Sequence, residues 1–298
     1  MIFSDEQSIY EVRNYATRGN AMLASEIVLV ELTASQLDGA LALSQQAQWP
    51  HRIEDWAMGL ALSRGVAAVH KGRVLGTAMT THYGDDAATI NMVIVDEAMR
   101  GLGIGKRLMD FALNAASGRE CRLVATQDGL PLYQKLGFRE THRIVQHQGP
   151  VSAMQPSEGV EWSDAKDVAE CARLDLAACG MDRRDLITYL ASNGRLAVIR
   201  RDGCVAGFAA IRRFGRGEVV GPIVAENTVD AKNLLSFLMA GREGQFLRVD
   251  TSEQSGLASW LTELGLSHVG GGIAMIRDGK PYSNTTVQTF ALASQALG

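Results

Sequence analysis

Apolar and polar residues follow one another along the chain in short stretches whose spacing switches between that of strands and that of helices. From residue 27 onward the pattern predicts a strand, two helices, a β-hairpin, a further strand, a helix, a strand, a short helix and a last strand. These elements are expected at residues 27–32, 35–46, 54–63, 66–70, 74–81, 89–95, 104–117, 122–125, 130–136 and 143–148. Segment 89–95 is apolar nearly throughout, which is typical of a strand covered on both faces.

The helix that follows residue 103 has the clearest apolar stripe. Its apolar residues recur at i, i+4, i+7, i+8 and i+11, which is one face of a helix, and they are Ile104, Leu108, Phe111, Ala112 and Ala115. Gly118 follows as a helix stop. We therefore expect these five residues to face the core.

A similar order of elements recurs from about residue 160. The turn segment KGRVLG at 71–76 parallels DGCVAG at 202–207, and KLGF at 135–138 parallels ELGL at 263–266. The chain is therefore expected to hold two tandem copies of one fold.

Domain boundaries follow from this repeat. The first copy is expected at 25–149 and the second at 160–298, with a linker containing Pro, Ser and Glu at 150–159. Residues 1–24 fit neither copy and are expected to be an N-terminal extension, so Met22 is an alternative to Met1 as the biological start.

Composition narrows the class of protein. The 298 residues are 46% hydrophobic and 21% charged, which is ordinary for a globular chain with room for two domains. Without a membrane-spanning apolar stretch or a secretory leader we expect a cytoplasmic protein that does not bind membranes. A net charge of −4 argues against a nucleic-acid partner and favours a small molecule. The sequence does not indicate the oligomeric state.

The cysteines and histidines give no sign of a metal site. The four cysteines are scattered without a C-x-x-C pair or a histidine at ligand spacing, and they are Cys121, Cys171, Cys179 and Cys204. We expect buried, reduced thiols and no metal.

The segment VIVDEAMRGLGIGK, Val93 to Lys106, carries the strongest chemical signal. An apolar strand runs into a glycine-rich turn that opens a helix, and such a turn binds phosphate through backbone N–H groups and the helix N-terminus. Arg100 and Lys106 add positive charge. An ordinary loop before a helix is the alternative interpretation.

Spacing excludes two common phosphate-binding motifs. A P-loop requires glycine at Arg100 and a hydroxyl residue at Arg107. A dinucleotide-binding fold requires G-x-G-x-x-G on the first strand of its domain, whereas this chain has G-x-G-x-G after about a hundred residues.

The remaining pattern is R-x-x-G-x-G, formed by Arg100, Gly103 and Gly105. It resembles the pyrophosphate loop of the GNAT superfamily of acyl-CoA-dependent N-acyltransferases, and LYQKLGF at 132–138 resembles that family's second signature. The resemblance implies an α/β (α+β) fold, with a mixed, mostly antiparallel sheet flanked by helices in each copy. It also implies acetyl-CoA as co-substrate and direct attack by an amine, and the chain offers no clear covalent nucleophile.

The resemblance also assigns the cofactor contacts. The residues expected to hold the pyrophosphate are Arg100, Gly101, Leu102, Gly103, Ile104, Gly105 and Lys106. The backbones of Val93 and Val95 would pair with pantetheine, and an N–H near Val93 or Ile94 would stabilise the oxyanion. Thr126 stands where many relatives have an asparagine that contacts pantetheine.

Tyr133 matches the family's general acid, which protonates the departing sulfur of CoA. A phenol with an ordinary pKa of about 10 stays protonated at pH 7 and can donate to a thiolate. The alternative is a structural aromatic residue, but Leu132 and Leu136 already provide a packing face at i, i+4.

The acceptor wall is expected at WPHRIEDW, residues 49–56, between the first two helices. Trp49, His51, Arg52 and Asp55 are the candidate substrate residues, with His51 or water as the base. Alternatively the tryptophans fill the core, and Asp55 only favours a helix N-terminus.

The second copy diverges where the chemistry would occur. In place of the glycine turn it has VAENTVDA at 224–231, whose two carboxylates would repel a pyrophosphate, and in place of Tyr133 it has Leu261. We expect it to be a degenerate GNAT-like domain. A further charged cluster of Asp175, Asp182, Arg183 and Arg184 is expected to be a solvated helix face, and the alternatives are that it closes over the acceptor site or binds another ligand.

Three functions stay open at this point. A small-molecule amine acetyltransferase is favoured if the second domain roofs the acceptor groove, whereas an open groove would favour a protein N-terminus or lysine. A non-catalytic acyl-CoA sensor is the third.

Overall fold

The computed structural model describes residues 26–280 and 285–298. The expected extension at 1–24 and the alternative start at Met22 therefore lie outside the described residues. The first half contains β1(Val28–Glu31), η1(Ala34–Gln36), α2(Leu37–Gln46), α3(Ile53–Leu62), β2(Arg64–His70), β3(Arg73–Tyr83), β4(Ala87–Val95), η2(Glu97–Met99), α4(Ile104–Ala116), β5(Glu120–Ala125), α5(Leu130–Lys135) and β6(Arg139–Pro150).

The second half repeats this order. It contains β7(Val160–Trp162), η3(Ala165–Asp167), α6(Val168–Cys179), α7(Arg184–Asn193), β8(Arg195–Arg201), β9(Cys204–Phe214), β10(Gly217–Ala225), α8(Thr228–Met239), β11(Phe246–Ser252), η4(Glu253–Ser255), α9(Ala258–Glu263), β12(Ser267–Arg277) and β13(Gln288–Ala291). The expected repeat of one α/β fold is confirmed, since both β2–β3 and β8–β9 turn on a residue pair with positive φ, Lys71-Gly72 and Asp202-Gly203.

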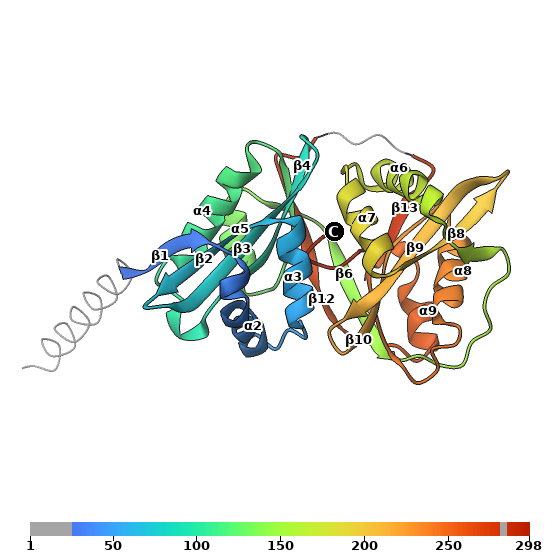
Figure 1. Cartoon of the computed structure of the whole chain (residues 1–298), viewed down its shortest axis with the longest axis horizontal. Helices are drawn as coiled ribbons and strands as arrows, with labels where there is room; N and C mark the ends of the chain where they lie inside the picture. Colours follow the sequence, from blue (N-terminus) through green and yellow to red (C-terminus); the bar gives the residue numbers. More distant parts are fainter. Residues whose placement is uncertain (1–25, 281–284) are drawn as a thin grey trace, which may run out of the picture.

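The two halves form two lobes side by side, and the described end of the chain lies between them (Figure 1). In the first lobe α4 packs on one face of the sheet, while α2 and α3 cover the other through a separate apolar cluster. In the second lobe α8 and α9 cover one face, and α6 and α7 cover the other. No helix in the described part of the chain is long and apolar enough to cross a membrane.

The halves exchange strands. The described strands form one 13-stranded sheet in the order β1-β2-β3-β4-β5-β12-β6-β11-β13-β10-β9-β8-β7. Strand β12 of the second half therefore pairs with β5 of the first, and β6 of the first half pairs with β11 of the second. Because β6 pairs on both edges, it extends over Arg139–Pro150 and is longer than the predicted 143–148. The domain boundaries stay a prediction.

The apolar stripe of α4 differs in two positions from the expected one. Ile104, Leu108 and Ala112 are buried, but Phe111 is 44% exposed and Ala115 is only partly buried. Met109 and Ala116 are buried instead, because the stripe follows i, i+4, i+5, i+8 and i+12. The prediction was wrong for Phe111, and Ala115 lies at the edge of the stripe, only partly buried.

Strands β4 and β5 separate along their length. They pair in parallel from Ala87 with Glu120 to Thr89 with Arg122, and no further pairs follow. The equivalent strands β10 and β11 pair in parallel from Glu218 to Val220, after which β13 pairs with β10 at residues 223–225. Among the described strands, none fills the gap between the central strands in the first half, whereas β13 fills it in the second.

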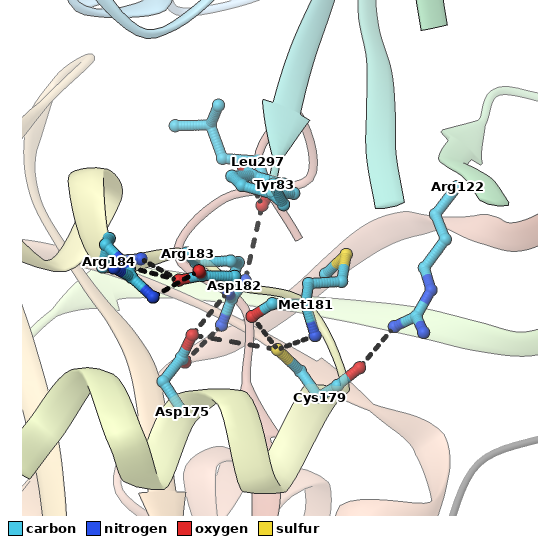
Figure 2. A network of polar contacts seen from close by, with 9 residues as sticks. All are labelled: Tyr83, Arg122, Asp175, Cys179, Met181, Asp182, Arg183, Arg184 and Leu297. Atoms are coloured by element: carbon cyan, nitrogen blue, oxygen red, sulfur yellow. Dashed lines mark hydrogen bonds and ion pairs between the residues drawn. The ribbon is translucent and has the colours of Figure 1, made fainter. Parts of the chain in front are cut away.

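A buried ion pair ties the chain's last residues into the junction between the lobes (Figure 2). Arg183 donates from Nε and Nη2 to the Asp175 carboxylate at 2.8 and 2.6 Å, and both side chains are fully buried. The carbonyl of Leu297 accepts from Tyr83 Oη at 2.8 Å and from Arg183 Nη1 at 3.4 Å. The prediction of a solvated face was therefore wrong for Asp175 and Arg183.

That prediction failed because a helix face that looks polar in sequence lies at an interface between the halves. The exposed member of the cluster is Arg184, which pairs with the partly buried Asp182 at 2.7 Å. The cysteines also differ from expectation in part: Cys121 and Cys171 are buried, but Cys179 is partly exposed and Cys204 is exposed at the start of β9.

Candidate active site

A cavity of about 740 Å³ lies where the first half meets the second. It extends into the gap between β4 and β5, since Val93 of β4 and Val124 of β5 both contribute to its wall. Trp49, His51, Val93, Thr126 and Tyr133, all predicted from sequence, line this one cavity.

A β-bulge bends β4 beside the cavity. Thr77 pairs with Ile94 and Met79 with Asn91, so Met92 and Val93 together oppose one residue of β3. Met92 takes a φ of 50°, and its carbonyl accepts from Thr77 Oγ1 at 2.7 Å. Bulges re-aim backbone groups next to active sites, and this one frees the backbone around Val93 from the ladder. The sequence gives no sign of this bulge, because the residue with the positive φ is a methionine and not the glycine or asparagine that more often takes that conformation.

The glycine turn follows β4, which lines the cavity from Ile90 to Val93, but the turn's own residues lie outside the cavity wall. Gly101 and Gly103 have φ of 83° and 76°, conformations that side-chain-bearing residues rarely adopt. Gly103 leads directly into α4, whose first-turn N–H groups, from Ile104 to Lys106, have no partners within the helix. This arrangement suits an anion.

The charged residues of the turn are exposed. Arg100 lies 3.5 Å from Asp128, and Lys106 lies 2.6 Å from Asp110. These surface pairs are weak in water, so both cations can turn to an arriving phosphate.

Asp96, which the sequence analysis did not single out, anchors the turn. It is 2% exposed, accepts from the backbone N–H of Ala98 at 3.0 Å and pairs with Arg73. The sequence signal that could have identified Asp96 is its position directly after the apolar segment 89–95.

Tyr133 is buried beside the cavity on α5. Its ring lies edge-on to Phe138 at 6.1 Å, and Gly129 leaves room for it, since a Cβ there would lie 2.8 Å from Tyr133 Cε2. No hydrogen bond to the Tyr133 hydroxyl occurs among the described residues. Burial raises the pKa of Tyr133 to about 12, so the phenol stays protonated at neutral pH. Leu261, its counterpart on α9, is fully buried in the core.

His51 is a neutral imidazole in the cavity wall. Burial, together with Arg248 and Arg212, lowers the pKa of His51 to about 4 against the opposing effect of Asp55. Its Nδ1 is buried and has no hydrogen-bond partner among the described residues. A neutral ring of this kind can accept a hydrogen bond from a bound ligand.

This pKa predicts an acid-sensitive stability. As pH falls, His51 of the unfolded chain becomes protonated near pH 6.5, whereas His51 of the folded protein stays neutral until about pH 4. The stability that depends on neutral His51 is therefore complete above pH 6.5 and is lost as pH falls toward 4. Between pH 7 and pH 4.5 the wild type should lose about 2 kcal/mol of unfolding free energy that His51→Gln does not lose. Urea unfolding at several pH values measures this. Equal pH slopes for both proteins would contradict it, and the exposed His268→Gln is the control.

Arg52 and Asp55 do not line the cavity. Arg52 donates from Nη2 to Asp55 Oδ1 at 2.9 Å, and Asp55 accepts the backbone N–H of Gly215 at 3.0 Å. Burial acts to raise the pKa of Asp55, but the bonds from Arg52 and Gly215 outweigh it and hold the pKa below its usual value. The pair therefore joins the start of α3 to the β9–β10 hairpin. Trp56 is fully buried in the core.

The second half supplies residues that local sequence reasoning missed. Phe214, Arg216 and Arg248 from β9, the hairpin turn and β11 form part of the cavity wall, as do Ser294 to Ala296 near the end of the chain. Their contribution depends on contacts between residues more than a hundred positions apart. Among the described residues no group of three His, Cys, Asp or Glu side chains could hold a metal ion.

Comparisons with known proteins agree with this geometry. Two family models, each described as an acetyltransferase (GNAT) domain, match residues 62–140 and 171–291. An uncharacterized N-acetyltransferase of Bacillus subtilis, YitH, is 28% identical over 281 residues, which cover 91% of this chain and 98% of that protein.

Solved structures share the architecture. A candidate acetyltransferase from Pyrococcus horikoshii superposes with a TM-score of 0.76 at 21% identity, over 92% of this chain and 96% of that one. A tandem GNAT protein from the clavulanic acid biosynthesis pathway gives a TM-score of 0.56 at 15% identity, over 86% of this chain and 100% of that one. The chain therefore belongs to the GNAT superfamily of acetyltransferases and carries two copies of the GNAT fold in tandem.

Proposed function

We propose that the protein is an acetyl-CoA-dependent N-acetyltransferase that acts on a primary amine of a small molecule in its first half. One observation carries the proposal: the gap between β4 and β5 opens into a cavity that holds a protonated phenol, next to a glycine turn fit for a pyrophosphate.

In this mechanism the turn from Arg100 to Lys106 holds the pyrophosphate, and pantetheine lies along the backbone of Val93 and Val95 as an added strand. The amine attacks the thioester carbonyl directly, so an N–C bond forms as the C–S bond breaks. A backbone N–H at Val93 or Ile94 stabilises the oxyanion, and Tyr133 gives its proton to the leaving thiolate. The amine's own proton leaves to water, with His51 as a hydrogen-bond acceptor, because a pKa of about 4 makes His51 a weak base.

Two features favour a small acceptor over a protein. Phe214, Arg216 and Arg248 of the second half form part of the wall of the same cavity that Tyr133 of the first half lines. Ser294, Gln295 and Ala296, near the described end of the chain, also contribute to the wall, so residues of both halves surround the space in which an acceptor would lie.

We propose a single cofactor site per chain. In the second half β13 pairs with β10 where pantetheine would pair, and a Cβ at Gly221 of β10 would lie 1.9 Å from the Leu292 carbonyl. The carboxylates that replace the glycine turn, Glu226 and Asp230, both pair with Arg201. The second half therefore has no cofactor site in this proposal, and its role is to shape the acceptor pocket through the residues that it contributes to the cavity wall.

The test combines CoA binding with CoA release. Calorimetry should detect association with acetyl-CoA, and a panel of amines should include some that release free CoA. Gly103→Glu should weaken acetyl-CoA binding about 10- to 100-fold, because it brings a negative charge against the phosphates. Gly203→Glu is the matched control, since Gly203 has a similar φ of 80° in the second half with open space around it.

Binding without CoA release from any amine would favour an acyl-CoA sensor. No binding at all would overturn the whole proposal.

A further inference from the structure

The wall of the active-site cavity has an unbalanced charge. Among the described residues that line it, the charged side chains are Arg216 and Arg248, and no aspartate, glutamate or lysine contributes. The other polar residues there are mostly neutral amides, such as Gln146 and Gln148. A cavity wall whose charged side chains are guanidinium groups favours an anionic ligand.

Arg248 is fixed in place by the second half. It is 8% exposed and donates from Nε and Nη2 to Asp250 at 2.9 and 3.1 Å. Asp250 is fully buried and also accepts from Gln295 at 3.0 Å. The bidentate bond holds the guanidinium plane, while Nη1 has no partner among the described residues.

Arg216 lies at the exposed rim of the same cavity. It packs over the ring of Phe246 with Cζ 4.8 Å from the centroid, and no ion pair to it occurs in the described part of the chain. Its charge is thus available to a ligand without breaking an existing pair.

Residues behind the wall do not cancel this charge. Arg212 is 6% exposed, lies 3.7 Å from Asp55, and has a buried Nε with no hydrogen-bond partner among the described residues. Asp55 already binds Arg52 at 2.9 Å, so a single carboxylate serves two arginines there. Arg52 also lies 4.0 Å from Glu54, whose side chain is mostly exposed, so Asp55 is the buried carboxylate that Arg52 and Arg212 share.

We propose that the acceptor is an amine that also carries an anionic group, a carboxylate or a phosphate, and that Arg248 and Arg216 bind this group. The proposal rests on the proposed acetyltransferase function. Binding the anion at Arg248 and Arg216 leaves the amine to extend toward Val93 and Tyr133 within the same cavity. Polyamines and other polycations find no carboxylate in the described wall and are poor acceptors.

Matched pairs of acceptors test the proposal on the full-length protein. Amino acids are compared with their amides, phosphoethanolamine with ethanolamine, and spermidine serves as a polycation. The anionic member of at least one pair should release CoA with a kcat/KM at least about tenfold higher than its neutral partner. The amino-acid and phosphate arms distinguish a carboxylate from a phosphate.

Variants assign the effect to the arginines. Arg216→Gln should raise KM for the anionic acceptor roughly tenfold, and leave KM for acetyl-CoA and for the neutral partner unchanged. Arg248→Lys, which keeps the charge beside Asp250 but loses the planar fork, should raise the same KM. Arg213→Gln is the control, because Arg213 is exposed on the same hairpin but does not line the cavity.

Neutral amines or spermidine used as well as anionic amines would overturn the proposal while leaving the acetyltransferase function intact. An unchanged KM for the anionic acceptor in both variants would also overturn it. If no amine releases CoA, the proposed function itself fails, and titration of the anionic amines into the CoA-bound protein still tests the site: binding weakened by Arg216→Gln supports it, and no binding overturns it.

Discussion

Tyr133→Phe is expected to lower kcat by roughly 10²- to 10⁴-fold, the usual contribution of a general acid, while KM for acetyl-CoA changes little. The substitution removes one hydroxyl from a ring that is 8% exposed, and no hydrogen bond of that hydroxyl occurs among the described residues. Folding should therefore be unaffected. Steady-state kinetics with detection of released CoA measures the change. Because burial raises the pKa of Tyr133 to about 12, activity should not decline through this residue below about pH 11.

Tyr189→Phe is the matched control, since it removes the same atom from the partly buried Tyr189 on α7, which lies outside the cavity wall. Undiminished turnover in Tyr133→Phe would remove this residue from the mechanism. A large rise in KM for acetyl-CoA, with kcat unchanged, would make it a binding residue instead.

Asp175→Ala is expected to cost about 3 to 5 kcal/mol of unfolding free energy. The alanine leaves the Arg183 guanidinium buried without its carboxylate, and that guanidinium also binds the carbonyl of Leu297. The loss corresponds to a fall in Tm of roughly 10 °C for a chain of this size. Urea unfolding and calorimetry measure it.

Two variants separate the buried pair from a general effect of removing charge. Asp182→Ala breaks the more exposed pair with Arg184 and should cost less than about 1 kcal/mol. The double variant Asp175→Leu with Arg183→Met should recover most of the loss, because it removes both buried charges. Equal effects of Asp175→Ala and Asp182→Ala would contradict the prediction.

Local patterns were enough to predict the elements and several residues of the cavity wall, while the cofactor contacts stay a prediction. The glycine turn and Tyr133 each lie within a short segment whose spacing is decided by one turn or one helix, and the structure places Val93, Thr126 and Tyr133 around one cavity. The strand and helix order of both halves also follows from periodicity within each element.

Long-range pairing could not be predicted in the same way. Arg248 reaches the cavity because β11 pairs with β6, and β13 fills the second half's gap because the chain returns to β10 more than sixty residues later. Neither pairing leaves a periodic signal in the sequence. The buried ion pair was missed for the same reason, since charge in a helix predicts solvent unless the partner surface is known.

Strand β6 pairs with two strands of the second half and β12 with two strands of the first, which has a consequence for any attempt to shorten the protein. Cutting the gene after residue 150 would take away β12 and expose the backbone edge of β5 beside the cavity, while β6 would lose neighbours on both sides. An uncovered edge of this kind recruits another polypeptide. Neither half therefore keeps all its strand neighbours without the other, and the two have to be expressed as a single chain.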